Sequence, residues 1–124
     1  MSTRPTRHEQ AEAILQMKAG RFASKVLGRH ARTAEDFEEA FTLELIDLIA
    51  AIPDAETMLA LGRTRVGPKD GLYILDDGGS YRVYVQERGV TYYAERDLTF
   101  DQARTAVIER IIRLNGIPFT PPGT

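Results

Sequence analysis

The chain of 124 residues contains no cysteine. This absence excludes disulfide bonds, thiolate metal ligands and cysteine nucleophiles, and it suits a reducing compartment. Histidine is scarce as well, and His8 and His30 lack the i, i+4 spacing by which two ligands on one helix hold a metal ion. We therefore expect no metal site and no cofactor, with both histidines exposed near helix ends.

Long apolar segments are also missing. No run approaches the roughly 20 residues that a membrane-spanning helix needs. The start of the chain, MSTRPTRHEQAEAIL, has no apolar stretch suited to a secretory signal. We expect a cytoplasmic protein with no membrane partner.

The motifs of common catalytic sites are not visible. Ser24 and Ser80 lack a Gly-x-Ser-x-Gly elbow, and the segment GPKDG leads into a strand, whereas a phosphate-binding loop leads into a helix. We interpret GPKDG as a loop in which Lys69 keeps a minor functional role as an alternative. Asp76 and Asp77 are adjacent, which fits a hairpin turn better than a magnesium site, because neighbouring strand residues point to opposite faces. The sequence predicts that the protein is not an enzyme, although a site assembled from distant residues stays open.

What the chain does contain is typical of a folded domain. Its apolar fraction is 43% and its charged fraction is 27%, both ordinary for a globular protein. A domain of this length buries roughly two-thirds of the surface that its unfolded chain exposes. We predict a single domain over residues 1–124, with a helical half at 1–62 and a β-meander plus helix at 71–116.

Charge is unevenly distributed along the chain. Residues 1–32 carry a net charge of +5, and residues 33–61 carry -8, with eight acids and no base. Residues 62–98 are balanced, and residues 99–124 carry +1. An acidic segment repels phosphate and attracts basic partners, so we expect a protein partner and no nucleic acid. We expect the basic N-terminal segment mainly to neutralise the acidic helix beside it.

The apolar spacing predicts three helices in the first half of the chain. The first covers residues 9–27, with a bend or break at Gly20. The second covers residues 33–52, with Thr33 as its N-cap, and its broad apolar stripe predicts a central helix. The third covers residues 54–62.

Strands and a last helix are predicted in the second half. The segments LYIL (72–75), YRVYVQE (81–87) and VTYYAE (90–95) alternate with glycine-containing turns and predict a three-stranded antiparallel meander. The last helix begins with Thr99 as its cap and ends at Gly116. The predicted fold class is therefore α+β: three N-terminal helices, a three-stranded antiparallel β-meander and a C-terminal helix packed on the sheet.

The first candidate binding surface is acidic. The segment TAEDFEEAFTLELIDLI places Glu35, Glu38 and Glu39 within about one helical turn, with Asp47 further along. A solvated helix face is the alternative. No Lys or Arg is interspersed to form i, i+4 pairs, which favours a surface for a basic partner.

The second candidate is one face of the predicted sheet. If Tyr81, Val83 and Val85 face the core, the opposite face of the middle strand meets solvent. Tyrosine and arginine are enriched at interface hot spots. The alternatives are that a helix or the loops cover this face, and that RNA bases stack on it, which the small number of strands disfavours. The residues predicted there are Tyr73, Arg82, Tyr84, Gln86 and Arg88, with Tyr93 taken from the pair Tyr92 and Tyr93.

The second half of the chain also shows a family resemblance. Residues 81–112, YRVYVQERGVTYYAERDLTFDQARTAVIERII, contain an aromatic-x-Val-Tyr-x-x-Glu-Arg-Gly hairpin, a short strand, a phenylalanine and an apolar helix. This pattern resembles the C-terminal half of small immunity proteins found with bacterial polymorphic toxins. The resemblance implies a cytoplasmic α+β domain that binds one cognate toxin domain and blocks its active site or substrate entry. The chain departs from the pattern in lacking the cysteine often found near the start of the last helix.

The residues and the resemblance together predict an immunity protein that binds a toxin domain with a basic cleft, one to one. The first alternative is a non-catalytic adaptor or chaperone for a secreted effector. The second is a small ligand-binding domain or enzyme, which would need a deep pocket where Arg82, Tyr84, Arg88 or Lys69 meets carboxylates. Pairing of an edge strand with another chain also stays open.

Overall fold

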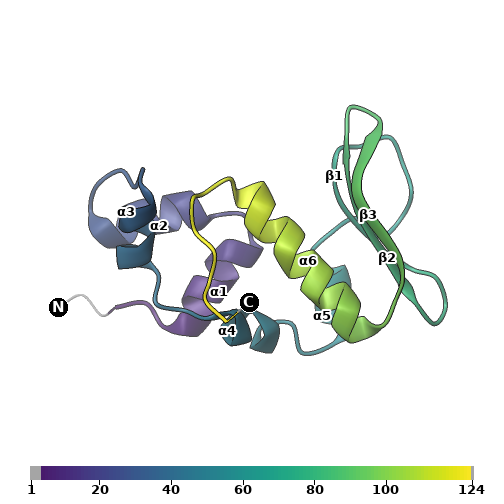
Figure 1. Cartoon of the computed structure of the whole chain (residues 1–124), viewed down its shortest axis with the longest axis horizontal. Helices are drawn as coiled ribbons and strands as arrows, with labels where there is room; N and C mark the ends of the chain where they lie inside the picture. Colours follow the sequence, from purple (N-terminus) through teal and green to yellow (C-terminus); the bar gives the residue numbers. More distant parts are fainter. Residues whose placement is uncertain (1–3, 124) are drawn as a thin grey trace. The chain divides into compact units, whose positions relative to one another are not determined.

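The computed structural model describes residues 4–123 (Figure 1). Contacts within the chain divide it into two compact units: residues up to Ala51 with those from Ile111 onward, and Ile52–Arg110. We call them the helical unit and the sheet unit. Helix α6 (Phe100–Asn115) begins in the sheet unit and ends in the helical unit. Helices and a three-stranded antiparallel sheet make an α+β fold, as predicted.

The helical unit is built from short helices around a small apolar core. Ile14, Leu43 and Leu48 are buried in it, and the ring of Phe41 stacks on Phe22 and Phe119 with centroid distances of 5.6 and 5.3 Å. Such offset aromatic contacts stabilise a core beyond the area they bury. The helices that begin in this unit are α1 (Arg7–Leu15), α2 (Ala19–Leu27), α3 (Ala34–Ala40) and α4 (Leu45–Ala50).

The first predicted helix is divided into α1 and α2 by a break that precedes Gly20. Met17 adopts a left-handed conformation with φ of 61°. The side chain of Asn115 lies beside this break: its Nδ2 donates to Ile14 O at 2.9 Å and its Oδ1 accepts from Ala19 N at 3.3 Å. A side chain at the end of α6 thus hydrogen-bonds backbone groups on both sides of the break.

The second predicted helix is divided into α3 and α4 by a buried glutamine. Gln10 Oε1 accepts from the backbone amides of Thr42 and Leu43 at 2.8 and 3.0 Å, and Gln10 Nε2 donates to Thr42 Oγ1 at 3.0 Å. In a continuous helix those two amides would bond to carbonyls one turn earlier. The buried amide of Gln10 therefore replaces helical hydrogen bonds at the break.

The sheet unit contains α5 (Ala55–Leu59), β1 (Gly71–Asp76), β2 (Tyr81–Glu87), β3 (Val90–Leu98) and most of α6. The strand order is β1-β2-β3, with antiparallel pairing throughout. Asp54 caps α5, and Thr99 with Gln102 forms the predicted capping box of α6. Helix α6 contacts the sheet through Arg110, as detailed below.

The two edges of the sheet differ. The edge of β1 is continued by Arg63, whose N donates to Leu72 O and whose O accepts from Ile74 N, both at 2.8 Å. The pairing of β3 with β2 is shifted twice, and Tyr93 and Asp97 of β3 have positive φ values of 52° and 58°. Bulges of this kind interrupt an edge strand and hinder its pairing with another chain.

Candidate functional site

The candidate residues lie in both units. Glu35, Glu38, Glu39 and Asp47 belong to the helical unit. The sheet unit holds Tyr73, Arg82, Tyr84, Gln86, Arg88 and Tyr93.

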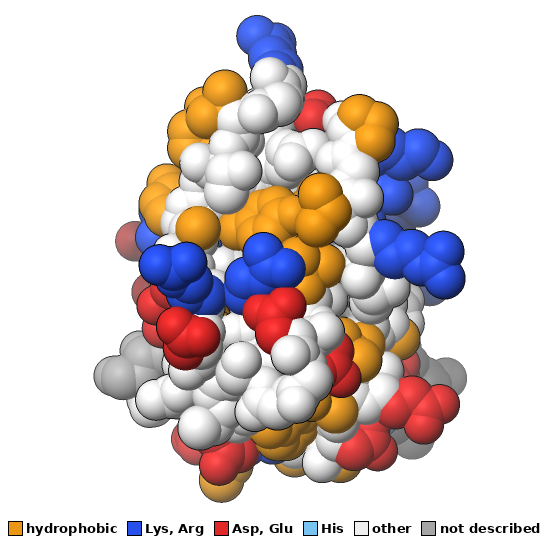
Figure 2. All heavy atoms as spheres, turned by 90° about the vertical axis from the view of Figure 1, so that its right-hand side faces the viewer, with side chains coloured by type: hydrophobic (Ala, Val, Ile, Leu, Met, Phe, Trp, Pro, Cys, Tyr) orange, Lys and Arg blue, Asp and Glu red, His pale blue; other side chains and the backbone are white. Residues whose placement is uncertain are grey.

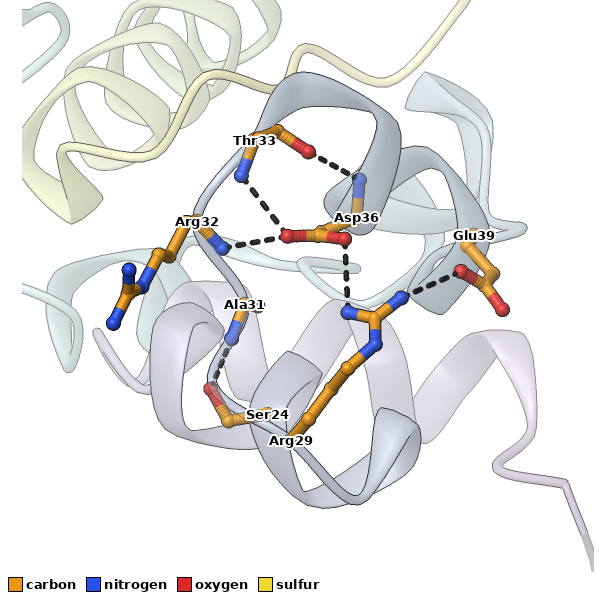
Figure 3. Close-up of polar contacts among 7 residues, drawn as sticks. All are labelled: Ser24, Arg29, Ala31, Arg32, Thr33, Asp36 and Glu39. Carbon is orange, nitrogen blue, oxygen red and sulfur yellow. Dashed lines mark hydrogen bonds and ion pairs between the residues drawn. The ribbon is translucent and has the colours of Figure 1, made fainter.

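A polar network fixes the start of α3 (Figure 3). Thr33 Oγ1 accepts from Asp36 N at 3.2 Å, and Asp36 Oδ2 accepts from the backbone amides of Arg32 and Thr33 at 2.9 and 3.1 Å. The guanidinium of Arg29 donates to Asp36 Oδ1 at 2.8 Å and to Glu39 Oε2 at 3.1 Å. The basic N-terminal segment therefore neutralises part of the acidic helix, as the sequence predicts.

Asp36 has a strongly perturbed carboxyl group. The backbone amides of Arg32 and Thr33 hydrogen-bond the ionised form, and Arg29 adds a favourable charge, which together lower the pKa of Asp36 to about 2. Hydrogen bonds to a carboxylate favour its charged form. Asp36 is accordingly ionised across the physiological range and serves to hold α3 in place.

The exposed acids of α3 form what we call the α3 acidic face, consisting of Glu35, Glu38 and Glu39. All three are exposed, while Phe37 on the other side of the helix is buried. Glu35 and Glu38 make no hydrogen bond or ion pair with any residue that the structure describes. Their charges are therefore available to a basic partner.

Asp47 is engaged within the chain. Its Oδ2 accepts from the backbone amide of Glu44 at 2.7 Å, which closes the N-terminus of α4, and lies 3.7 Å from Arg7 Nη1. Its side chain is 21% exposed. The structure thus separates Asp47, with its capping role, from the α3 acidic face.

The outer face of the sheet, opposite Val83, carries Arg82 and Tyr84. Arg82 donates from Nε and Nη2 to the two carboxylate oxygens of Asp77 at 2.8 and 3.1 Å. The half-buried Tyr84 stacks on Tyr73 with a centroid distance of 4.8 Å. Burial, followed by the neighbouring Tyr73, raises the pKa of Tyr84. These two side chains lie on the face that the sequence predicts.

The prediction that Tyr73 lies on an exposed face is wrong. Tyr73 is fully buried because residues 63–70, which we call loop 63–70, pass over it. Its hydroxyl, which has one proton to donate, lies within hydrogen-bond distance of two carbonyl oxygens, Gly67 O at 3.0 Å and Lys69 O at 2.5 Å. Gln86 Nε2 donates to the same two carbonyl oxygens at 2.8 and 3.1 Å. The alternative that a loop covers this face therefore holds for Tyr73 and for the half-buried Gln86.

Arg88 occupies the hairpin turn between β2 and β3. It has a φ of 51° and precedes Gly89 with a φ of 78°, the positive values that a tight two-residue hairpin requires. Its backbone amide donates to Asp70 Oδ1 at 2.9 Å, and the residue is exposed. Arg88 thus sits beside loop 63–70 with its side chain at the surface.

Tyr93 belongs to a different contact from Tyr84. Its carbonyl oxygen accepts from Arg110 Nη2 at 2.8 Å, and the guanidinium of Arg110 lies 5.7 Å from the centre of its ring. The same Nη2 donates to Glu95 Oε2 at 2.9 Å. Because Arg110 lies on α6, Tyr93 links β3 to this helix and is not a cross-strand neighbour on the outer face. The register shift between the pairs Val83–Glu95 and Val85–Tyr92 places a bulge at Tyr93, whose φ is positive. This bulge takes Tyr93 out of the regular alternation along β3.

Loop 63–70 presents Arg65 and Val66, which the sequence analysis does not consider, beside Lys69, which it names only as an alternative. Arg65, Val66 and Lys69 are exposed, and Val66 is 71% exposed. Figure 2, which views the right-hand side of Figure 1, shows exposed hydrophobic side chains with both basic and acidic side chains next to them. The spacing of bases in RTRVGPKD was the available signal, but only the structure shows the loop lying on the sheet. A surface pocket of about 350 Å³ there is lined by Arg63, Thr64, Arg65, Gly67, Pro68, Lys69 and Tyr73.

Residues 4–123 contain neither a metal-binding cluster nor a helix suited to a membrane. Nowhere in that range do three His, Asp or Glu side chains gather as they would around a metal ion. No helix there combines the length and the apolar character needed to cross a bilayer.

Comparisons of the chain with family models, curated proteins and solved structures gave no match.

Proposed function

We propose that the chain is an immunity protein that binds a cognate bacterial toxin domain one to one and inhibits it by covering its active site or substrate entry. The observation that carries this proposal is the α3 acidic face. The carboxylates of Glu35 and Glu38 in this face are unpaired, and they lie on a helix that Arg29 and Asp36 hold in place. The resemblance of residues 81–112 to small immunity proteins supplies the class of partner.

The rigidity of the α3 acidic face supports a binding role. A surface that is already ordered loses less conformational entropy when a partner binds. The Thr33 and Asp36 capping box and the Arg29 contacts restrain the helix without using Glu35 or Glu38. The two unpaired carboxylates are thus presented in fixed positions to a basic cleft, where they accelerate encounter with the partner.

The outer face of the sheet supplies a second kind of contact. Tyr84 and Arg82 combine large desolvatable area with directional hydrogen bonding, the properties of interface anchors. Tyr84 is held by stacking on the buried Tyr73, and Arg82 by Asp77. A stable complex of standard size buries roughly 1,600 Å² in total, so a few anchors with a polar rim suffice for tight binding.

The test is co-expression with the product of the adjacent gene. We expect the chain to rescue cells from that product and to co-purify with it. The double variant Arg82→Ala with Tyr84→Ala should weaken rescue, while Arg21→Ala, which removes an exposed arginine of α2, should retain it. A chain that protects against no neighbouring gene product would refute the proposal.

A further inference from the structure

The path of loop 63–70 is fixed at several points. Its first residue, Arg63, continues the sheet beside β1 and donates from Nε to Asp70 O at 2.9 Å. At its far end, Asp70 Oδ1 accepts from the backbone amide of Arg88 at 2.9 Å. Its middle is held by Tyr73 and Gln86, which donate to the carbonyl oxygens of Gly67 and Lys69. These contacts restrain the backbone along the loop.

Two glycines allow this path. A Cβ atom at Gly62 would lie 2.9 Å from Leu72 O, closer than real Cβ contacts come, so the chain approaches β1 only with glycine there. Gly71 has a φ of 134°, a conformation that other residues rarely adopt. Two glycines thus permit the backbone path of this surface loop, and the side chains of Tyr73 and Gln86 hold it on the sheet.

Three exposed side chains of the restrained loop, those of Arg65, Val66 and Lys69, have no hydrogen-bond or ion-pair partner in the described part of the chain. Arg65 and Lys69 make no hydrogen bond or ion pair with any residue from 4 to 123, and Val66 is 71% exposed. The nearest acid in sequence, Asp70, already accepts the Arg88 amide. An ordered loop with unpaired cations and an exposed apolar residue is preorganised for a ligand.

We propose that loop 63–70 binds an acidic segment of a protein, with carboxylates meeting Arg65 and Lys69 and an apolar side chain packing on Val66. Charge complementarity selects the anionic groups, and arginine pairs with a carboxylate in a bidentate geometry. Val66 favours a protein over nucleic acid, because an apolar side chain covers it, whereas phosphate groups, the anionic part of a nucleic acid, do not. The neighbouring ring of Tyr73 is buried and unavailable for stacking on a base. This inference does not depend on the partner being a toxin.

The experiment measures binding of a fluorescent peptide, Asp-Glu-Leu-Asp-Glu-Leu, to the full chain by anisotropy at low ionic strength. Arg65→Glu with Lys69→Glu should lower the affinity about tenfold, as expected when contacting charges are reversed. The matched control is Arg21→Glu with Lys25→Glu in α2. Those residues are exposed and unpaired within residues 4–123, and the substitution makes the same change in net charge. The control should leave the affinity within about twofold.

A second arm separates the apolar contact from the charges. Val66→Ser should weaken binding of the leucine peptide about threefold, as loss of a small buried apolar contact implies, and should not affect a peptide with serine in place of leucine. Equal losses in the two charge-reversal pairs, no measurable peptide binding, or tighter binding of a single-stranded oligonucleotide through Arg65 and Lys69 would each overturn the inference. Circular dichroism of each variant confirms that it is folded.

Discussion

At the scale of single residues, Asp36 shows how one carboxylate holds an element without being a contact residue itself. Its pKa is lowered from 3.8 to about 2, so it binds a proton more readily in the unfolded chain than in the folded one. Its stabilising contribution is therefore fully present above about pH 4 and is lost as the pH falls through about 2.

The difference between the pKa of Asp36 in the folded and unfolded chain predicts how the free energy of unfolding depends on pH. Asp36→Asn should flatten the loss of unfolding free energy between about pH 4 and pH 2, because the variant has no carboxylate to protonate there. Urea unfolding at a series of pH values measures the effect. Glu35→Gln is the control, since Glu35 has no partner in the described residues, and it should keep the slope of the original chain. Parallel curves for all three proteins would show that Asp36 does not stabilise α3.

Tyr73 and Tyr84 form a matched pair of phenols for a second prediction. Tyr73→Phe removes the hydroxyl that lies within hydrogen-bond distance of Gly67 O and Lys69 O, whereas the Tyr84 hydroxyl has no hydrogen bond to a described residue. We expect Tyr73→Phe to lower the free energy of unfolding by about 1 kcal/mol and to speed amide exchange in loop 63–70. Tyr84→Phe should change neither. Equal effects in urea unfolding and hydrogen exchange would contradict the assigned role of Tyr73.

At the scale of elements, the strands, α5 and α6 were predictable because their signals are local. Gly89 supplies the hairpin turn, Asp54 and Thr99 cap their helices, and β-branched and aromatic residues alternate along the strands. The break between α1 and α2 was predicted at Gly20 but precedes that residue, and no break was predicted between α3 and α4. Both breaks depend on Asn115 and Gln10, whose side chains reach residues far away in sequence.

The candidate site was predictable to a similar extent. Alternation along β2 correctly places Arg82 and Tyr84 opposite the buried Val83. The alternation gives no indication that loop 63–70 covers Tyr73, because that contact joins segments that are separate in sequence. It also gives no indication that a bulge brings Tyr93 to Arg110. Local periodicity therefore identifies a face but not what lies on it.

The α3 acidic face carries the prediction at this scale. Glu35→Lys with Glu38→Lys should slow association with the cognate toxin domain about tenfold at low salt and reduce its salt dependence, because these charges steer encounter. Dissociation should change less. Stopped-flow mixing at several salt concentrations measures both rates.

The matched control for this prediction is Glu56→Lys with Glu87→Lys. Both residues are exposed and unpaired within the described chain, and the change in net charge is the same. If both double variants slow association equally, the effect comes from net charge, and the α3 acidic face is not the contact.

At the scale of the whole molecule, acidic and basic side chains are concentrated in different segments of the chain. The acids of residues 33–61 and the bases of RTRVGPKD give the chain surfaces of opposite sign, although its net charge is only -2. The first belongs mainly to the helical unit and the second to the sheet unit. Such a chain suits a binding protein that meets different chemistry through different surfaces.

The proposed immunity function requires that this protein act by covering another protein. The sharpest test is a titration of the enzymatic activity of the purified product of the adjacent gene with the purified chain. We expect a linear loss of activity that is complete at about one equivalent, as a tight one-to-one complex requires. Full activity in the presence of an excess of the chain, or in a co-purified complex, would contradict the proposed function.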